Sequence, residues 1–215
     1  GDMEYAQKLV AGMLQRAERE GASRLCDSVR AFSCWLSLYE NKTSRILSWM
    51  ETAPDETVEF CTLNRYLYLV RIYGYIALGR HTEALVLIRR MTLYADYAQR
   101  TYLQMEYGLL NAIILRRTGK PWKDEFVQTL KRAREYHFVP LVSAKGAAVL
   151  SMLTEVKALF TQDDGPTAAW FRQVLDEAAH MARLYPNYLK GTGIDVSAFS
   201  PTALQVLRMQ AAGYT

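Results

Sequence analysis

Residues 77–91 read ALGRHTEALVLIRRM, and this stretch predicts two helices joined by a tight turn. Apolar residues before the turn recur at three- and four-residue spacing up to Leu78, which is the pattern of an amphipathic helix. Gly79 then supplies the left-handed backbone conformation that commonly ends a helix. Because Ala84 and Ile88 begin a second apolar stripe, we expect the chain to turn back on itself at Gly79.

The same order of apolar stripe, turn residue and apolar stripe occurs on both sides of Gly79. The turn residue is Asn41 on one side and Gly119 on the other, and Asn also tolerates the left-handed conformation. A fourth unit fits residues 141–185, with its turn near Gly165. A repeat of about 40 residues with two helices predicts an array in which each hairpin packs against its neighbours. We therefore expect an all-α fold, a right-handed superhelical array of about four helical hairpins.

The pattern of stripes divides the chain into three parts. Residues 1–185 form the predicted helical-repeat domain. Residues 186–198 are rich in Pro, Asn and Gly and predict a linker. Residues 199–215 open with Ser200-Pro201, a good start for a helix, and carry a short apolar stripe that predicts the beginning of a further helical domain.

The composition is that of a globular protein, with 50% hydrophobic and 22% charged residues among 215. The formal net charge of +4 is mildly basic and falls short of a dedicated nucleic-acid surface. No run of about 18 apolar residues occurs, and the first residues lack the pattern of a signal peptide. We therefore expect a cytoplasmic protein with no membrane contact.

No arrangement of residues indicates catalysis. Cys26, Cys34 and Cys61 lie on apolar helical stretches, and their spacing offers no close pair of metal ligands, so we expect buried, reduced thiols. None of the three histidines stands beside a carboxylate or a cysteine at the spacing of a metal site or a nucleophile–base pair. The expectation is a protein that is not an enzyme and has no catalytic residue, metal or cofactor.

Two segments of the repeat region resemble known families. Residues 77–91 resemble the turn of a tetratricopeptide repeat, in which Gly79 makes the turn and the small Ala84 lets two helices approach closely. The period of about 40, together with AREYHFVPLV at 133–142, resembles the helical-repeat region of MalT-like, LuxR-family transcription regulators of bacteria. That resemblance implies a tetratricopeptide-like solenoid followed by a linker and a helix-turn-helix.

The last 17 residues, FSPTALQVLRMQAAGYT at 199–215, resemble the opening of the LuxR-type helix-turn-helix. That motif typically begins Leu-Thr-Pro, continues through Val-Leu-Arg and reaches Ala-Gly. The matching residues include Ser200, Pro201, Val206, Leu207, Arg208 and Gly213. The family usually has Glu where this chain has Ala203 and Gln205. The resemblance implies DNA binding through a helix-turn-helix whose recognition helix lies beyond Thr215.

The chain has 14 tyrosines, many of them on the first helices of the predicted hairpins. In tetratricopeptide-like arrays these helices line a concave groove, and counting back from the turn residues gives the positions that face it. The candidate groove residues are Trp35, Tyr39, Tyr66, Tyr73, Glu106 and Arg116. Aromatic rings with occasional charges suit the capture of a ligand or peptide. The alternative is that these aromatic side chains pack between repeats as ordinary core.

These observations lead to one expected function and one alternative. We expect an effector- or partner-binding regulatory domain of a LuxR-family transcription regulator, which takes a small molecule or a regulatory protein in its groove and relays the signal to the helix-turn-helix. Self-association is compatible with this function. The alternative is a stand-alone tetratricopeptide-like scaffold for protein–protein interaction.

Overall fold

The computed structural model describes residues 3–54 and 60–189, and all regular structure in these two ranges is helical. The elements are α1 (Met3–Arg19), α2 (Ser23–Tyr39), α3 (Thr43–Thr52), the 3-10 helix η1 (Thr62–Asn64), α4 (Arg65–Ala77), α5 (His81–Tyr97), α6 (Thr101–Arg117), α7 (Lys123–Glu135), α8 (Val139–Ser143), α9 (Ala147–Phe160) and α10 (Pro166–Leu184). The predicted all-α class is confirmed. None of these helices has the length and apolar character needed to cross a membrane.

The four predicted hairpins correspond to the helix pairs α2/α3, α4/α5, α6/α7 and α9/α10. The structure adds α1 before the first pair and the short α8 before the last one. The apolar stripe from 141 to 159 is therefore not one helix, because the backbone breaks between α8 and α9. Gly146 makes that break with a φ of 49°, and a Cβ there would lie 3.2 Å from the backbone nitrogen of Ala182 in α10.

Six helix ends in the described part of the chain share one kind of turn, in which a residue with positive φ follows the helix. At the end of α4, Gly79 donates a backbone hydrogen bond to Ile76 and Arg80 donates one to Tyr75, at 3.2 and 2.8 Å. This pair of bonds satisfies carbonyl groups that the helix end leaves open. The positive-φ residues of the six turns are Gly21, Asn41, Gly79, Gln99, Gly119 and His137. The turn positions predicted at Asn41, Gly79 and Gly119 are confirmed.

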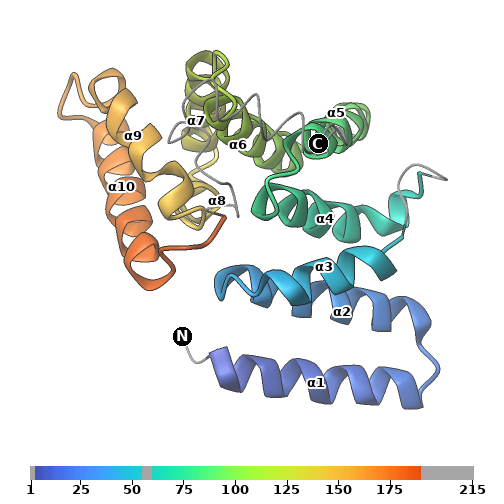
Figure 1. The fold of residues 1–215 in the computed structure, drawn as a ribbon. Coiled ribbons are helices and arrows are strands. Elements are labelled where there is room, and N and C mark those ends of the chain that lie inside the picture. Colours follow the sequence, from blue (N-terminus) through green and yellow to red (C-terminus); the bar gives the residue numbers. More distant parts are fainter. Residues whose placement is uncertain (1–2, 55–59, 190–215) are drawn as a thin grey trace, which may run out of the picture.

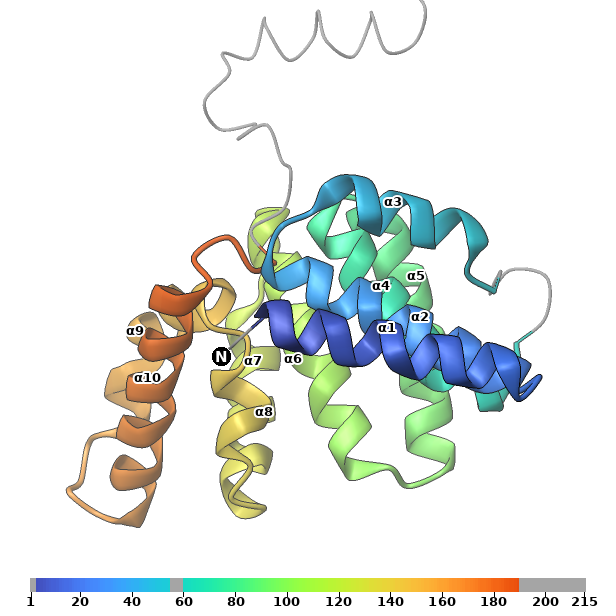
Figure 2. The same cartoon turned by 90° about the horizontal axis from the view of Figure 1, so that it is seen from below.

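The helices from α1 to α7 follow one another along an arc, with α9 and α10 at its far end (Figure 1). After α10 the chain turns back, and residues 185–189 run towards the inner side of the arc, as both views show (Figures 1 and 2). One continuous hydrophobic core runs from α2 to residues 188 and 189. At the inner side of the arc, residues 188 and 189 therefore return to the helices at the start of this core.

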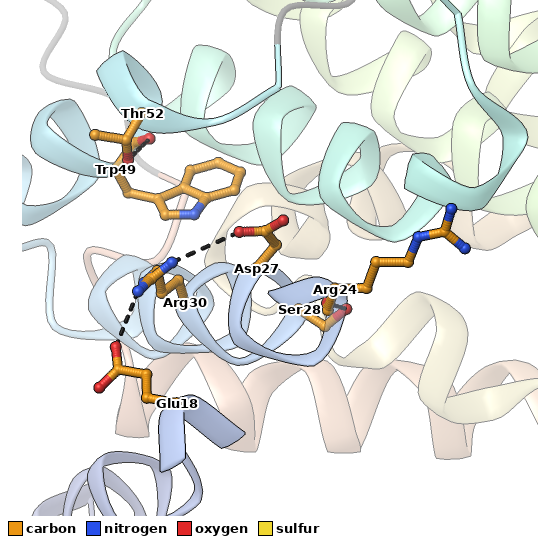
Figure 3. A network of polar contacts seen from close by, with 7 residues as sticks. All are labelled: Glu18, Arg24, Asp27, Ser28, Arg30, Trp49 and Thr52. Carbon is orange, nitrogen blue, oxygen red and sulfur yellow. Dashed lines mark hydrogen bonds and ion pairs between the residues drawn. The ribbon is translucent and has the colours of Figure 1, made fainter. Parts of the chain in front are cut away.

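The first helix packs on α2 outside the main hydrophobic core. Its apolar contact with α2 is a separate small cluster around Val10, Val29 and Leu36. Arg30 of α2 adds an ion pair with Glu18 of α1, at 2.9 Å, and lies near Asp27 (Figure 3). Because both side chains of the Glu18–Arg30 pair are about half exposed, the pair adds little stability.

Candidate functional site

The aromatic residues predicted to line the groove meet where α2 packs against α4. The ring centroid of Trp35 lies 4.7 Å from that of Tyr73 and 6.3 Å from that of Tyr66. Tyr66 and Tyr73 are seven residues apart, which is close to two helical turns, so both project from one face of α4. That face points at α2, and Trp35 fits between the two tyrosine rings.

Behind this aromatic face lies a buried ion pair. The carboxylate of Glu106, on α6, accepts hydrogen bonds from the ammonium of Lys145 at 2.9 and 2.8 Å and from the hydroxyl of Tyr73. The side chains of Lys145 and Glu106 are only 5% and 2% exposed. The Lys145 nitrogen also lies 5.3 Å from the centre of the Tyr73 ring. One acid therefore joins α4, α6 and the turn between α8 and α9.

Residues 185–189 cover the aromatic face from the inner side of the arc. The ring of Tyr188 stacks on that of Tyr39 at 4.2 Å, with an angle of 6° between the planes, and lies 6.4 Å from the ring of Tyr73. Tyr185 meets Tyr39 edge-on at 4.8 Å. We call Trp35, Tyr39, Tyr66, Tyr73 and Tyr188 the inner aromatic cluster. Tyr188 and Leu189 are almost completely buried, so the first part of the predicted linker is packed on the helices.

The environment keeps the buried tyrosines protonated. Burial, followed by the negative charge of Glu106, raises the pKa of Tyr73 well above its ordinary value. Burial likewise raises the pKa of Tyr188 and brings that of Tyr66 to about 12. These hydroxyl groups are therefore neutral hydrogen-bonding groups at neutral pH. The ion pair is closed to solvent, so what it does within the fold is hold α4, α6 and the turn between α8 and α9 in position.

The six predicted groove residues do not all come together. Trp35, Tyr66 and Tyr73 are in mutual contact or share a partner, Tyr73 reaches Glu106, and Tyr39 joins them through Tyr188. Arg116 lies apart, where its guanidinium binds Glu155 of α9 at 2.6 Å and lies over the Trp122 ring. Whether any of the six binds a ligand stays a prediction.

The sequence reasoning missed two residues of this site. Lys145 is a lone charge within an apolar stretch, and that isolation is a signal of a buried ion pair. Tyr188 was assigned to the linker, and no local pattern marks its burial. The predicted start of the DNA-binding domain, with Ser200, Pro201, Val206, Leu207, Arg208 and Gly213, lies outside the described residues.

Metal-ligating groups do not gather anywhere within residues 3–54 and 60–189, where no three His, Cys, Asp or Glu side chains could share an ion. The three cysteines are free thiols, of which Cys26 and Cys34 are buried. Burial raises the pKa of Cys34 to about 12, which leaves its thiol unreactive.

A hollow lies between α5, α6 and α7. Its volume is about 670 Å³, and it is open to solvent. Apolar side chains of α5, among them Leu85, Ile88 and Leu93, form much of its wall. Leu93 is 67% exposed, so the hollow offers apolar surface that the described part of the chain leaves uncovered.

Comparison of the chain with models of protein families, with curated proteins and with solved structures gives no match.

Proposed function

We propose that this chain is the regulatory domain of a LuxR-family transcription regulator. In this proposal a small molecule or a regulatory protein binds at the inner side of the helical array, and the signal passes to a helix-turn-helix that begins at residue 199. The helices form a right-handed superhelical array in the manner of tetratricopeptide-like solenoids, and the domain carries out no catalysis itself.

The observation that carries the proposal is the contact of Tyr188 with the predicted groove. Tyr188 stacks on Tyr39, and its ring lies close to that of Tyr73. The same residue belongs to the short segment that leads towards residues 199–215, whose sequence resembles the LuxR-type motif. Because this segment leads to the proposed DNA-binding domain, a ligand that changes how the segment packs in the groove can act directly on that domain.

The mechanism follows from differential binding. A ligand shifts a conformational equilibrium only when it binds the two states with different affinity. A ligand on Trp35 and Tyr66 has different neighbours when residues 185–189 are packed against Tyr39 than when they are released. Binding therefore changes the fraction of molecules in which this segment is packed, and with it the position of the helix-turn-helix.

The experiment is a selection of binding sites from a pool of random DNA sequences, using the full-length gene product. The proposal predicts that one sequence motif is enriched. Residues 1–215 alone should enrich none, because the recognition helix that enters the major groove lies beyond them. A full-length product that enriches no motif, or a motif enriched equally by residues 1–215, contradicts the proposal.

The open hollow between α5, α6 and α7 favours a second candidate, a scaffold that docks a peptide from another protein. The two functions are separated by Leu93→Glu, which places a charge on this exposed apolar wall. If the chain is a regulator that senses at its inner side, the variant leaves DNA binding and its regulation unchanged. If the chain is a scaffold, the variant abolishes binding of the partner and changes nothing at the inner aromatic cluster.

A further inference from the structure

A small pocket lies between α6, α9 and the segment that follows α10. It encloses about 310 Å³. Its polar wall consists of Arg116 and Arg117 of α6 and the hydroxyl-bearing Ser151 of α9. The remaining wall includes Ile113, Ala148, Pro186 and Tyr188. We call this cavity the arginine pocket.

Each of the two arginines that line the arginine pocket has an unused hydrogen-bond donor. The Nη1 atom of Arg116 and the Nη1 atom of Arg117 are buried and find no hydrogen-bond partner among the described residues. The other Nη atom of each is engaged, by Glu155 for Arg116 and by the backbone carbonyl of Leu189 for Arg117. A buried donor without a partner costs about 1–3 kcal/mol, so two at one pocket call for an acceptor.

The charge of the pocket is also unbalanced. Glu155 pairs with Arg116, and its carboxylate also lies 3.8 Å from the ammonium of Lys123. Within residues 3–54 and 60–189, Arg117 has no carboxylate partner, and its contact with Leu189 is to a neutral carbonyl. Burial lowers the pKa of Arg117 to about 10. Burial, followed by the positive charge of Arg117, lowers the pKa of His81. The positive charge of Arg117 therefore acts on its neighbours and is not balanced by a carboxylate of the described residues.

We propose that the arginine pocket binds the phosphate or carboxylate group of a small molecule. A guanidinium presents its donors in a fixed fork that matches both groups. The guanidinium groups of Arg116 and Arg117, which line the pocket, supply these donors, and the hydroxyl of Ser151 adds another. The volume is near the lower end of the range for small-molecule sites, which fits a compact ligand whose carbon atoms contact Ile113 and Ala148.

If the proposed function is correct, this site identifies the effector as a small anion. The binding of an anion does not depend on the proposed function, but its effect on regulation does. Pro186 and Tyr188 form part of the wall, so an occupied pocket holds the segment after α10 against α6 and α9. The bound anion also balances the positive charge of Arg117. The guanidinium of Arg117 donates a hydrogen bond to the carbonyl of Leu189 and so holds that residue in place. Occupancy therefore favours the state in which residues 185–189 are packed on the inner aromatic cluster.

The first measurement is the melting temperature of residues 1–215 with added inorganic phosphate, glycerol 3-phosphate or succinate, at constant ionic strength set with chloride. A ligand that binds only the folded state raises its stability with concentration. We expect at least one of these anions to raise the melting temperature, and calorimetry gives its Kd. The phosphate and succinate arms show which of the two groups the pocket prefers. No rise with any of the three, relative to chloride, overturns the proposal.

The second measurement assigns the binding to this pocket. Arg117→Gln should weaken binding of the preferred anion by about tenfold or more, as expected for the loss of a charged hydrogen-bond donor. Arg89→Gln is the matched control, because Arg89 is exposed on α5. The substitution removes the same charge at a position away from the pocket. Equal affinity of the wild type and the Arg117→Gln variant overturns the proposal.

Ser151→Asp changes an exposed position, so we expect the fold to stay intact. It places a carboxylate at the pocket, so we expect a higher melting temperature without ligand and no further rise with phosphate. A normal response to phosphate in this variant also counts against the site.

These measurements need no DNA, so they separate the binding site from the proposed function. If anions bind and DNA binding of the full-length product does not respond, the site stands and the regulatory function fails. If no anion binds, the site fails and the inner aromatic cluster remains as the sensing surface.

Discussion

The ammonium of Lys145 lies 2.8 and 2.9 Å from the two carboxylate oxygens of Glu106, and the two residues are 39 positions apart in the sequence. Both side chains are almost completely enclosed. Burying two charges is costly, and the attraction between them recovers that cost only when the geometry is good. The pair therefore fixes how α6 meets the turn between α8 and α9, at the place where Tyr73 also binds.

Removing one partner of this pair should destabilise the fold strongly. Glu106→Gln leaves the Lys145 charge buried without a counterion, and we expect a loss of about 3–5 kcal/mol in the free energy of unfolding, measured in urea. The double variant Glu106→Leu with Lys145→Met removes both charges and should lose much less. If the loss in the double variant equalled the sum of the losses in Glu106→Leu alone and Lys145→Met alone, the two residues would not be coupled.

Two tyrosines of α4 should respond differently to truncation. Tyr73 is fully buried, so Tyr73→Ala should cost about 3–5 kcal/mol of stability, as for other large core residues. Tyr66 is partly exposed, and Tyr66→Ala should cost clearly less while weakening the response to an effector. Thermal denaturation of both variants measures this difference. If Tyr66→Ala lost as much stability as Tyr73→Ala, the aromatic face of α4 would be part of the core and would not be a sensing surface.

The helix-end turns allow a stabilising change. Gln99 and His137 have positive φ values of 51° and 54°, which cost a residue with a side chain about 1–2 kcal/mol. After allowing for the greater freedom of Gly in the unfolded chain, Gln99→Gly and His137→Gly should each raise the free energy of unfolding by about 0.5 kcal/mol. Gly79→Ala is the reverse change and should lower it by about 1 kcal/mol. A loss of stability in Gln99→Gly would contradict the shared turn geometry.

Thiol labelling tests the burial of the cysteines. Only the thiolate reacts, and the raised pKa of Cys34 keeps the thiolate fraction very small at mildly alkaline pH. Cys61 is partly exposed, so it should be modified first in the native protein, and Cys34 only after unfolding. Mass spectrometry of partly labelled protein gives the order. Rapid labelling of Cys34 in the folded chain would show that α2 is less closely packed than described.

The sequence predicts the helices well because their apolar periodicity and their glycine turns are local signals. Gly79 and Gly119 are recognisable because Gly adopts positive φ without strain. Gln99 and His137 make the same turn, but the helices on each side impose that conformation on them, and no local signal shows it. The predicted spacing of about 40 therefore captured every second turn in this part of the chain.

The candidate site was predictable only in part. Helical spacing places Tyr66 and Tyr73 on one face, so their proximity follows from the sequence. The position of Tyr188 does not follow, because its contact with Tyr39 joins distant parts of the chain. Arg116 was expected beside the tyrosines, yet α6 directs it to Glu155 and the arginine pocket. Contacts of this kind depend on how the whole array curves.

The most direct test of the account is the affinity of the full-length gene product for its selected DNA when Tyr188 is changed. If residues 185–189 relay the signal, Tyr188→Ala releases this segment from Tyr39 and should change the Kd for DNA by about fivefold or more, which corresponds to about 1 kcal/mol of coupling. Tyr97→Ala is the control, because Tyr97 is 91% exposed on α5 and should leave the Kd unchanged. Circular dichroism establishes that both variants keep their helices. The same Kd for the wild type and both folded variants would contradict the proposed relay.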